Sequence, residues 1–268
     1  WVIADTYCMV YIFLLIVGMN LYTTDERENK ALLILLSMVI CWLTLSRAEM
    51  SVCMACIVCL ISFLPLTQRE MLTLSVPMMV VQLLYLIELN YQQAISVKNV
   101  YDSMLTPAIQ AIITVATVGC VIYSFFINSK FYSWIRKKIN IIVFAVLPGI
   151  CIAIYFLDKE KYVKSIESII YNFKTQYWGY LPALILILYI MIVLNKRINF
   201  WLIFSTGYVL INLILCLGRK HPLRNGYGDS CNRIMMSAIP VVFFALICSV
   251  LEIVALRIKE NREQEEYK

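Results

Sequence analysis

The sequence predicts an all-α membrane protein with about nine transmembrane helices and one helix on the membrane surface. Nine apolar stretches fill almost the whole chain, and short polar connectors separate them. Hydrophobic residues make up 62% of the chain and charged residues 15%, and one helical crossing of a bilayer needs about 20 mostly apolar residues. The apolar runs are continuous rather than alternating, which favours helices over the strands of a barrel. We therefore predict a polytopic helical bundle.

The expected membrane helices follow the apolar runs in chain order. A crossing helix satisfies its own backbone hydrogen bonds, so each uninterrupted run is assigned to one helix. The spans are 2–22, 31–46, 51–66, 71–89, 106–127, 139–157, 179–195, 200–217 and 234–256. Together they form a single transmembrane domain over residues 1–256, followed by a tail over residues 257–268.

Two of these spans, 31–46 and 51–66, are short for a bilayer. Each has 16 residues, which at the helical rise cover about 24 Å, less than the hydrocarbon core. A single helix through both would place Arg47 and Glu49 in the middle of the membrane, where charges are costly. We therefore predict a tight hairpin that turns at residues 47–50.

Basic residues set the expected orientation, because cytoplasmic connectors carry an excess of Lys and Arg. This rule favours a cytoplasmic tail and an outward position for the connectors 90–105, 158–178 and 218–233. We expect a multi-pass protein of the cell membrane. The chain enters an apolar segment at Trp1 without the basic start of a signal peptide, so we also expect N-terminal helices to precede it.

Residues 158–173 have the pattern of an amphipathic helix between two spans. Asp158 is placed to cap its start, and Lys159, Lys161 and Lys164 fall mostly off its apolar side. The apolar stripe consists of Tyr162, Val163, Ile166, Ile169, Ile170 and Phe173. The pattern predicts a helix on the membrane surface. Two roles remain for this helix: a plain connector, or a lid or wall over a groove through which a lipid enters.

The connector 218–233 is the most chemically dense part of the chain. Its basic residues are Arg219, Lys220, Arg224 and Arg233, and it also holds the single acid Asp229 and the only histidine, His221. Arg233 stands at the start of the last span, where the free N–H groups of a helix favour anions and a guanidinium can grip phosphate with two bonds. The alternative is that Arg233 reaches to lipid head groups while Asp229 pairs with it.

Three further groups of polar residues and cysteines allow predictions. Glu88 and its polar neighbours either line a cavity or mark the point where a helix leaves the lipid, and Glu252 is expected to pair with Arg257 or Lys259. Cys53, Cys56 and Cys59 form a C-x-x-C-x-x-C run inside an apolar segment, where Cys behaves as a small hydrophobe and no fourth ligand follows. We therefore predict no metal site in the protein.

Two segments resemble bacterial membrane-embedded glycosyltransferases of the GT-C superfamily. The apolar run 33–49 ends in Arg47-Ala48-Glu49 and looks like the segment that ends in Arg-Pro-Glu in that family, with Ala48 in place of the proline. Residues 228–240, which read Gly-Asp-Ser-Cys-Asn-Arg-Ile-Met-Met-Ser-Ala-Ile-Pro, are similar to its late loop and helix. The resemblance is to the C-terminal portion of enzymes of the protein O-mannosyltransferase and aminoarabinose transferase kind.

This resemblance implies a transferase that moves a sugar from a polyprenyl-phosphate carrier to a glycan, lipid or protein acceptor at the outer membrane face. It implies that cationic side chains bind the lipid phosphate and that polar neighbours support them. The first set is Arg233, Arg224, Arg219 and Arg47, and the second is Asp229, Asn232, Glu49, His221 and Tyr227. No position matches the acidic catalytic residue of the family, so this chain is expected to lack it. No cofactor is expected, and a divalent cation stays open.

Other classes of function remain as alternatives. A transporter or flippase for lipid-linked sugars would use the same basic connector, and a polymerase is a close variant of the transferase. A non-catalytic scaffold is disfavoured because only 8 glycines occur and no G-x-x-x-G lies in an apolar run. Nucleic acid is not an expected partner despite the net charge of +6, because the basic residues are spread over many connectors.

Overall fold

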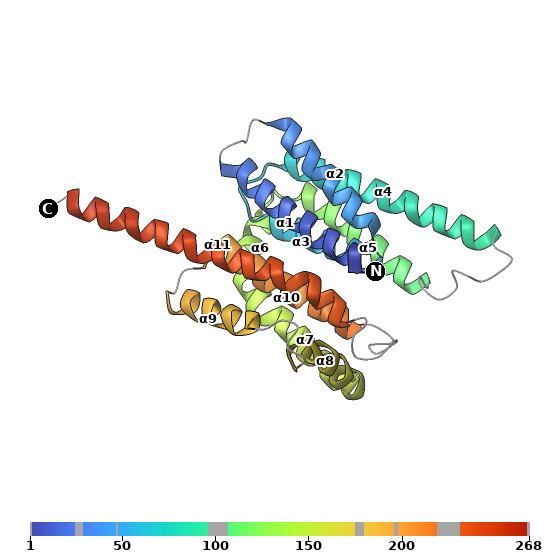
Figure 1. Cartoon of the computed structure of the whole chain (residues 1–268). Coiled ribbons are helices and arrows are strands. Elements are labelled where there is room, and N and C mark those ends of the chain that lie inside the picture. The colour runs from blue at the N-terminus through green and yellow to red at the C-terminus, as the bar shows by residue number, and fades with distance from the viewer. Residues whose placement is uncertain are drawn as a thin grey trace. The chain divides into compact units, whose positions relative to one another are not determined.

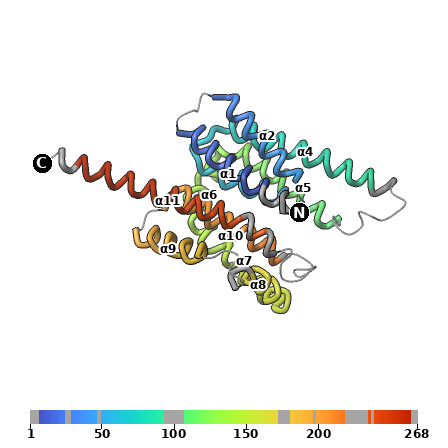
Figure 2. The backbone as a smooth tube through the Cα atoms, viewed as in Figure 1, coloured from blue at the N-terminus to red at the C-terminus, as the bar shows by residue number. Residues whose placement is uncertain are grey.

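The computed structural model describes residues 2–24, 29–46, 48–95, 107–174, 180–195, 198–218 and 231–266. Throughout these ranges the regular structure is helical, which confirms the all-α class. Two compact units emerge: an N-terminal unit, Trp1–Lys138, and a C-terminal unit, Ile139–Lys268. Figures 1 and 2 trace their helices along the chain.

The N-terminal unit contains α1 to α5 and most of α6. Their bounds are α1 Val2–Thr24, α2 Lys30–Ser46, α3 Ala48–Ile61, α4 Gln68–Ile95, α5 Pro107–Phe125 and α6 Lys130–Ile141. Helix α2 packs beside α1, α3 and α4, and α5 packs against α3 and α4, as Figure 1 shows for α2 and α4. The core between them is apolar, with Leu15, Met19, Ile40, Leu43 and Ile57 at 1% exposure or less.

The C-terminal unit continues from α6 through a π-helical turn. Its elements are η1 Ile142–Val146, α7 Leu147–Leu157, α8 Lys159–Lys174, α9 Leu181–Leu194, α10 Phe200–Gly218 and α11 Cys231–Glu266. Helices α10 and α11 lie side by side (Figures 1 and 2), and α7, α8 and α9 pack around this pair. On α10, Phe204 and Tyr208 stack with ring centroids 5.6 Å apart and are almost completely buried.

Six helical segments in the described ranges are long and apolar enough to cross a membrane. They are Tyr7–Thr24, Gln68–Gln92, Pro107–Phe125, Lys130–Leu157, Phe200–Leu217 and Ala238–Glu263. Three further apolar helices, Lys30–Ser46, Met50–Ile61 and Leu181–Leu194, are shorter. The structure therefore supports a multi-pass membrane protein, and the count of nine spans stays a prediction.

The packing of α3 against α2 confirms that the two short apolar runs are separate helices, but residues 48–50 of the predicted turn 47–50 already belong to α3. Helix α2 ends at Ser46, and α3 begins at Ala48 and packs back against α2. Helix α3 ends at Ile61, five residues before the end of the predicted span 51–66.

Three helices are longer than the predicted spans because amphipathic and polar flanks continue them. Helix α4 runs past residue 89 to Ile95, and the predicted connector 128–138 is largely helical as α6. Helix α11 continues through most of the tail, to Glu266. Apolar runs mark the lipid-crossing part of such helices but not their ends.

The π-helical turn has a cause in the sequence. Pro148 has no N–H for the carbonyl of Phe144, four residues earlier, and its ring would collide with that carbonyl in a regular helix. A wider turn avoids this, and the N–H of Leu147 instead bonds the carbonyl of Ile142, five residues back.

Pro77 creates the same problem inside α4, and a neighbouring helix resolves it. The carbonyl left without an intrahelical donor is that of Thr73, and Ser37 of α2 donates its hydroxyl to that oxygen at 2.8 Å. Ser37 is 5% exposed, so this bond forms where water cannot replace it. The α2–α4 contact is therefore polar at the one point where α4 needs a donor.

The start of α4 is held by a capping box and by the end of α1. Thr67 receives the N–H of Glu70 on its hydroxyl at 3.3 Å, and Glu70 receives the N–H of Thr67 on Oε2 at 2.6 Å. The hydroxyl of the buried Tyr22 donates to the other carboxylate oxygen of Glu70 at 2.8 Å. One side chain thus caps α4 and fixes α1 against it.

Candidate functional site

Most residues of the predicted phosphate site lie outside the described residues. This applies to Arg47, Arg219, His221, Arg224, Tyr227 and Asp229. Glu49 lies in the first turn of α3, and Asn232 and Arg233 lie in the first turn of α11, by their backbone alone. The structure therefore defines the helices on either side of the basic connector.

The two ends of the basic connector are packed together beside α8. Ile169 of α8, Cys216 near the end of α10, and Ile234 and Met235 near the start of α11 form one buried cluster. Ile166, Val209 and Leu213 pack against this cluster. The first turn of α11 therefore lies next to the amphipathic helix α8 and next to the end of α10.

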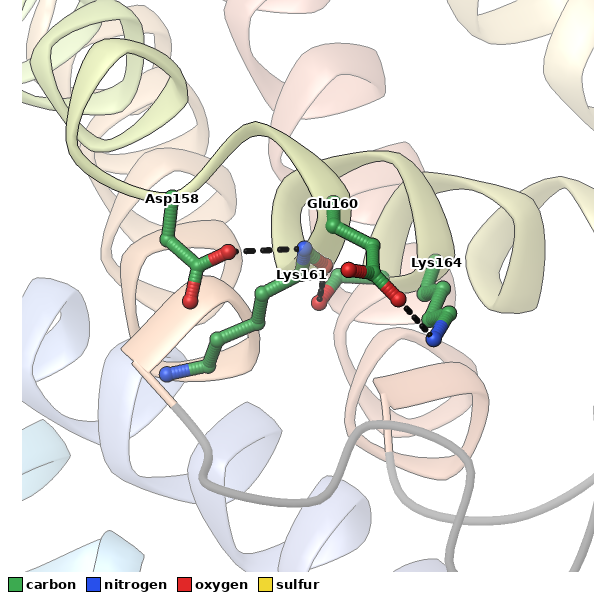
Figure 3. Close-up of polar contacts among 5 residues, drawn as sticks. Asp158, Glu160, Lys161 and Lys164 are labelled. Carbon is green, nitrogen blue, oxygen red and sulfur yellow. Dashed lines mark hydrogen bonds and ion pairs between the residues drawn. The ribbon is translucent and has the colours of Figure 1, made fainter.

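The predicted amphipathic helix is confirmed as α8, and its predicted cap, Asp158, is confirmed as well. Asp158 accepts the N–H of Lys161 on Oδ1 at 3.0 Å (Figure 3). Its own carbonyl accepts the N–H of Tyr162 at 3.0 Å. One turn further, Lys164 and Glu160 form an ion pair at 2.5 Å. Because Asp158 ends α7 and caps α8, it fixes the corner between these two helices.

The buried side of α8 differs from the predicted apolar stripe. Ser165 and Ser168 are completely buried, together with Ile169, whereas Val163 and Ile170 are 41% and 37% exposed. Small serines allow a close approach of the neighbouring helices α10 and α11, which displaces the contact face from the apolar stripe. Val163 and Ile170 then lie on the flank of the helix, where they would contact lipid.

Aromatic side chains pack against one another where α7 meets α8. The rings of Tyr155 and Tyr162 meet edge to face with centroids 5.3 Å apart, and the ammonium of Lys159 lies 5.9 Å above the ring of Tyr155. These contacts hold the start of α8 independently of its buried serines.

In the N-terminal unit, a buried polar group joins the end of α2 to the start of α3. The hydroxyl of Ser51 lies 3.1 Å from the carbonyl of Thr44 and 2.8 Å from Oε1 of Gln82. Ser51 and Gln82 are at most 1% exposed. The bonds join the end of α2, the start of α3 and the middle of α4. Gln82 and Ser51 were not predicted as part of this site, although a polar pair inside apolar runs is a signal that could have identified them.

Apart from the buried Gln82, the polar groups around Glu88 lie at the surface as far as they are described. Glu88 accepts a hydrogen bond from Gln92 at 2.6 Å, and Asn90 donates to Gln110 at 3.0 Å. Glu88, Asn90 and Gln92 of α4 are exposed, and Gln110 of α5 is half-buried. The remaining members of the predicted group, from Gln93 onward, lie outside the described side chains.

The predicted pairing of Glu252 is wrong. Its Oε2 accepts a hydrogen bond from the amide of Asn199 at 3.1 Å, whereas Lys259 pairs with Glu263 and Arg257 donates to Asn195. Asn199 also caps α10, accepting the N–H of Leu202 at 3.0 Å. The role of Asn199 was not predicted. Its side chain bonds both α10 and α11, and the sequence alone does not show that these helices meet there.

The cysteines of α3 pack within the N-terminal unit. Cys53 is fully buried, and Cys59 lies close to Cys120 of α5. Among the described residues, no group of three or more His, Cys, Asp or Glu side chains is arranged to hold a metal ion.

Comparisons with known proteins give no relative. The sequence matches no protein-family model, no curated protein and no solved structure.

Proposed function

We propose that the chain is the C-terminal part of a membrane-embedded glycosyltransferase that takes a sugar from a polyprenyl-phosphate carrier. In this proposal the basic connector 218–233 binds the phosphate of the carrier at the outer face of the cell membrane, and the tail, residues 257–268, is cytoplasmic. The acceptor is a glycan, a lipid or a protein. The residues assigned to the phosphate are Arg233, Arg224, Arg219 and Arg47.

The observation that carries the proposal is the packing of α8 against both ends of the basic connector. The cluster of Ile169, Cys216, Ile234 and Met235 gathers these ends beside a helix whose flank presents Val163 and Ile170. A lipid-linked substrate needs such a combination, because its chain stays in the bilayer while its phosphate must meet cations at the membrane surface.

The start of α11 adds a second favourable element for an anion. Cys231 opens the helix, so Asn232 and Arg233 belong to its first turn, where backbone N–H groups have no intrahelical acceptor. A guanidinium in that turn would add two parallel hydrogen bonds to a phosphate. The helix terminus and Arg233 would then act on the same charge.

The chemistry follows from this arrangement. The hydroxyl of the acceptor loses its proton to a carboxylate as its oxygen attacks the anomeric carbon, and the bond from that carbon to the phosphate oxygen breaks. The phosphate leaves with additional negative charge, which the arginines of the connector stabilise. No carboxylate of this chain is assigned as the base.

The test measures the binding of a polyprenyl phosphate to the full-length protein by native mass spectrometry in detergent. We expect Arg233→Gln to weaken binding by about 10-fold or more, since a hydrogen bond to a charged group contributes about 1.5–3 kcal/mol. Arg262→Gln in the exposed end of α11 removes the same charge elsewhere and should leave binding unchanged. Equal affinity of wild type and Arg233→Gln would remove the connector from the substrate site.

Transfer and transport are separated by a second measurement on the same protein. In vesicles, a transferase produces a glycosylated acceptor and free polyprenyl phosphate, whereas a flippase moves the intact lipid-linked sugar across the bilayer. Translocation without release of polyprenyl phosphate would favour the transporter alternative and reject the transferase.

A further inference from the structure

Helix α6 of the N-terminal unit presents an outward face of aromatic and basic side chains. Phe131 and Trp134 are 62% and 57% exposed, and their rings stack with centroids 6.3 Å apart. Lys130, Lys137 and Lys138 are exposed on the same side of the helix, because positions three, four and seven residues apart share a helix face. We call these five residues the α6 face.

The opposite side of α6 is fixed to the end of α3. The hydroxyl of the buried Tyr132 donates to the carbonyl of Ser62, and the guanidinium of Arg136 donates to the carbonyl of Phe63 at 3.2 Å. The hydroxyl of Ser62 lies 2.8 Å from that of Tyr123 on α5. These carbonyls follow the last turn of α3, where the helix has no donors of its own. The α6 face therefore has a defined direction, away from the bundle.

The positive charge of the α6 face is not neutralised within the protein as far as the structure describes it. The sequence contains no Asp or Glu between Asp102 and Asp158. The ion pairs found among described side chains are Lys164–Glu160 and Lys259–Glu263, and both lie in the C-terminal unit. Among the described side chains these three lysines have no carboxylate partner, which favours an anionic partner from outside the chain.

The position of α6 along the chain places this face at the level of lipid head groups. Lys130–Leu157 is one of the six candidate spans, and its apolar part, residues 139–157, has 19 residues. At the helical rise this part is about 28 Å long, close to the hydrocarbon thickness of about 30 Å. The α6 face then falls just beyond the hydrocarbon, where Trp and Lys are both favoured.

We propose that the α6 face binds the head-group phosphates of anionic phospholipids of the surrounding membrane. The lysines contact the phosphates, while Phe131 and Trp134 insert between the upper parts of the acyl chains. This site shares no residue with the proposed sugar-carrier site and does not depend on it.

The experiment measures the affinity of the full chain for phosphatidylglycerol and for phosphatidylcholine, by titration and native mass spectrometry in a mild detergent. A lysine near an anionic lipid surface contributes about 1 kcal/mol, or about fivefold in affinity. We expect Lys137→Gln/Lys138→Gln to weaken phosphatidylglycerol binding at least about fivefold and to leave phosphatidylcholine binding unchanged.

The matched control is Lys259→Gln/Arg262→Gln, which removes two exposed basic residues of α11 that alternate with glutamates. It should retain the affinity of the wild type, as should the charge-preserving variant Lys137→Arg/Lys138→Arg. Raising the salt concentration should weaken phosphatidylglycerol binding to the wild-type protein, a readout that needs no substitution. Unchanged affinity in Lys137→Gln/Lys138→Gln, an equal loss in the α11 control, or insensitivity to salt would overturn the proposal.

Discussion

At the scale of single residues, the bond from Ser37 to Thr73 links a proline in one helix to a serine in the next. Ser37→Ala leaves the carbonyl of Thr73 without a donor in an apolar environment, so we expect a loss of about 1–3 kcal/mol in the free energy of unfolding. In a Pro77→Ala background, residue 77 regains an N–H for that carbonyl, and the same substitution should cost much less. Reversible unfolding in detergent for the four proteins of this cycle measures the difference.

A control for this cycle is Ser133→Ala, which removes a hydroxyl from the exposed side of α6 and should change stability little. Additive effects of Ser37→Ala and Pro77→Ala would mean that the hydroxyl does not compensate for the proline.

Two glycines in membrane helices should respond differently to substitution by alanine. A Cβ at Gly119 of α5 meets no atom within 4 Å, whereas a Cβ at Gly18 of α1 would lie 2.6 Å from Cδ2 of Leu36. Gly119→Ala should stabilise by about 0.5–1 kcal/mol, as alanine does inside a helix. Gly18→Ala should give no gain, and Gly18→Val should destabilise, because α1 and α2 would have to separate. Unfolding in detergent tests both, and a gain from Gly18→Val would exclude the close contact.

At the scale of elements, α8 offers adjacent isoleucines with different surroundings. Ile169 is buried against α10 and α11, and Ile170 is 37% exposed. Ile169→Ala should therefore lower the free energy of unfolding by about 2–4 kcal/mol, and Ile170→Ala by less than about 1 kcal/mol in detergent. The comparison keeps the chemical change constant. Similar losses for both variants would mean that α8 is not seated on α10 and α11 in this register.

The elements also show which parts of the fold a sequence predicts well. Long apolar runs and the Asp158 cap predicted the positions of most helices, because lipid crossing and capping are local requirements. The contact face of α8 was predicted less well, since Ser165 and Ser168 are polar by composition yet buried by close packing. The pairing of Glu252 failed for a related reason: Asn199, its partner, comes from another helix.

At the scale of the whole molecule, α9 determines on which side the basic connector lies. Its 14 residues cover about 21 Å, and side chains around it are exposed, among them Leu186, Ile187, Val193 and Leu194. An apolar helix exposed on many sides fits lipid, and a local thinning of the bilayer accommodates its length. We therefore expect α9 to cross the membrane.

This expectation has a simple topological readout. If α9 crosses, the connectors that contain Asn99 and Asn225 lie on the same side of the membrane, whether or not the α2–α3 pair crosses. Glycosylation acceptor tags inserted at these two connectors should be modified together or not at all. Modification of only one tag would mean that α9 does not cross, and it would reverse the side assigned to residues 218–233 relative to 90–105.

The candidate site could be predicted only in part, because its residues come from separate connectors and helices. Its charged residues stand in connectors, where no periodic pattern relates them to one another, so the sequence placed Arg233 at a helix start but not beside any partner. The structure adds the surrounding helices: α8, α10 and α11 in one unit and the Thr44–Ser51–Gln82 group in the other. A carbonyl of α2 and side chains of α3 and α4 form that polar group, which explains why reading along the chain missed it.

The length of α11 has a practical consequence for imaging. Its 36 residues form one helix of about 54 Å, so about 24 Å extends beyond a hydrocarbon core of about 30 Å. A small, well-folded marker protein spliced into its exposed end in continuous helical register would inherit the orientation of the C-terminal unit. Such a fiducial would give electron cryomicroscopy the asymmetric feature outside the micelle that particle alignment requires.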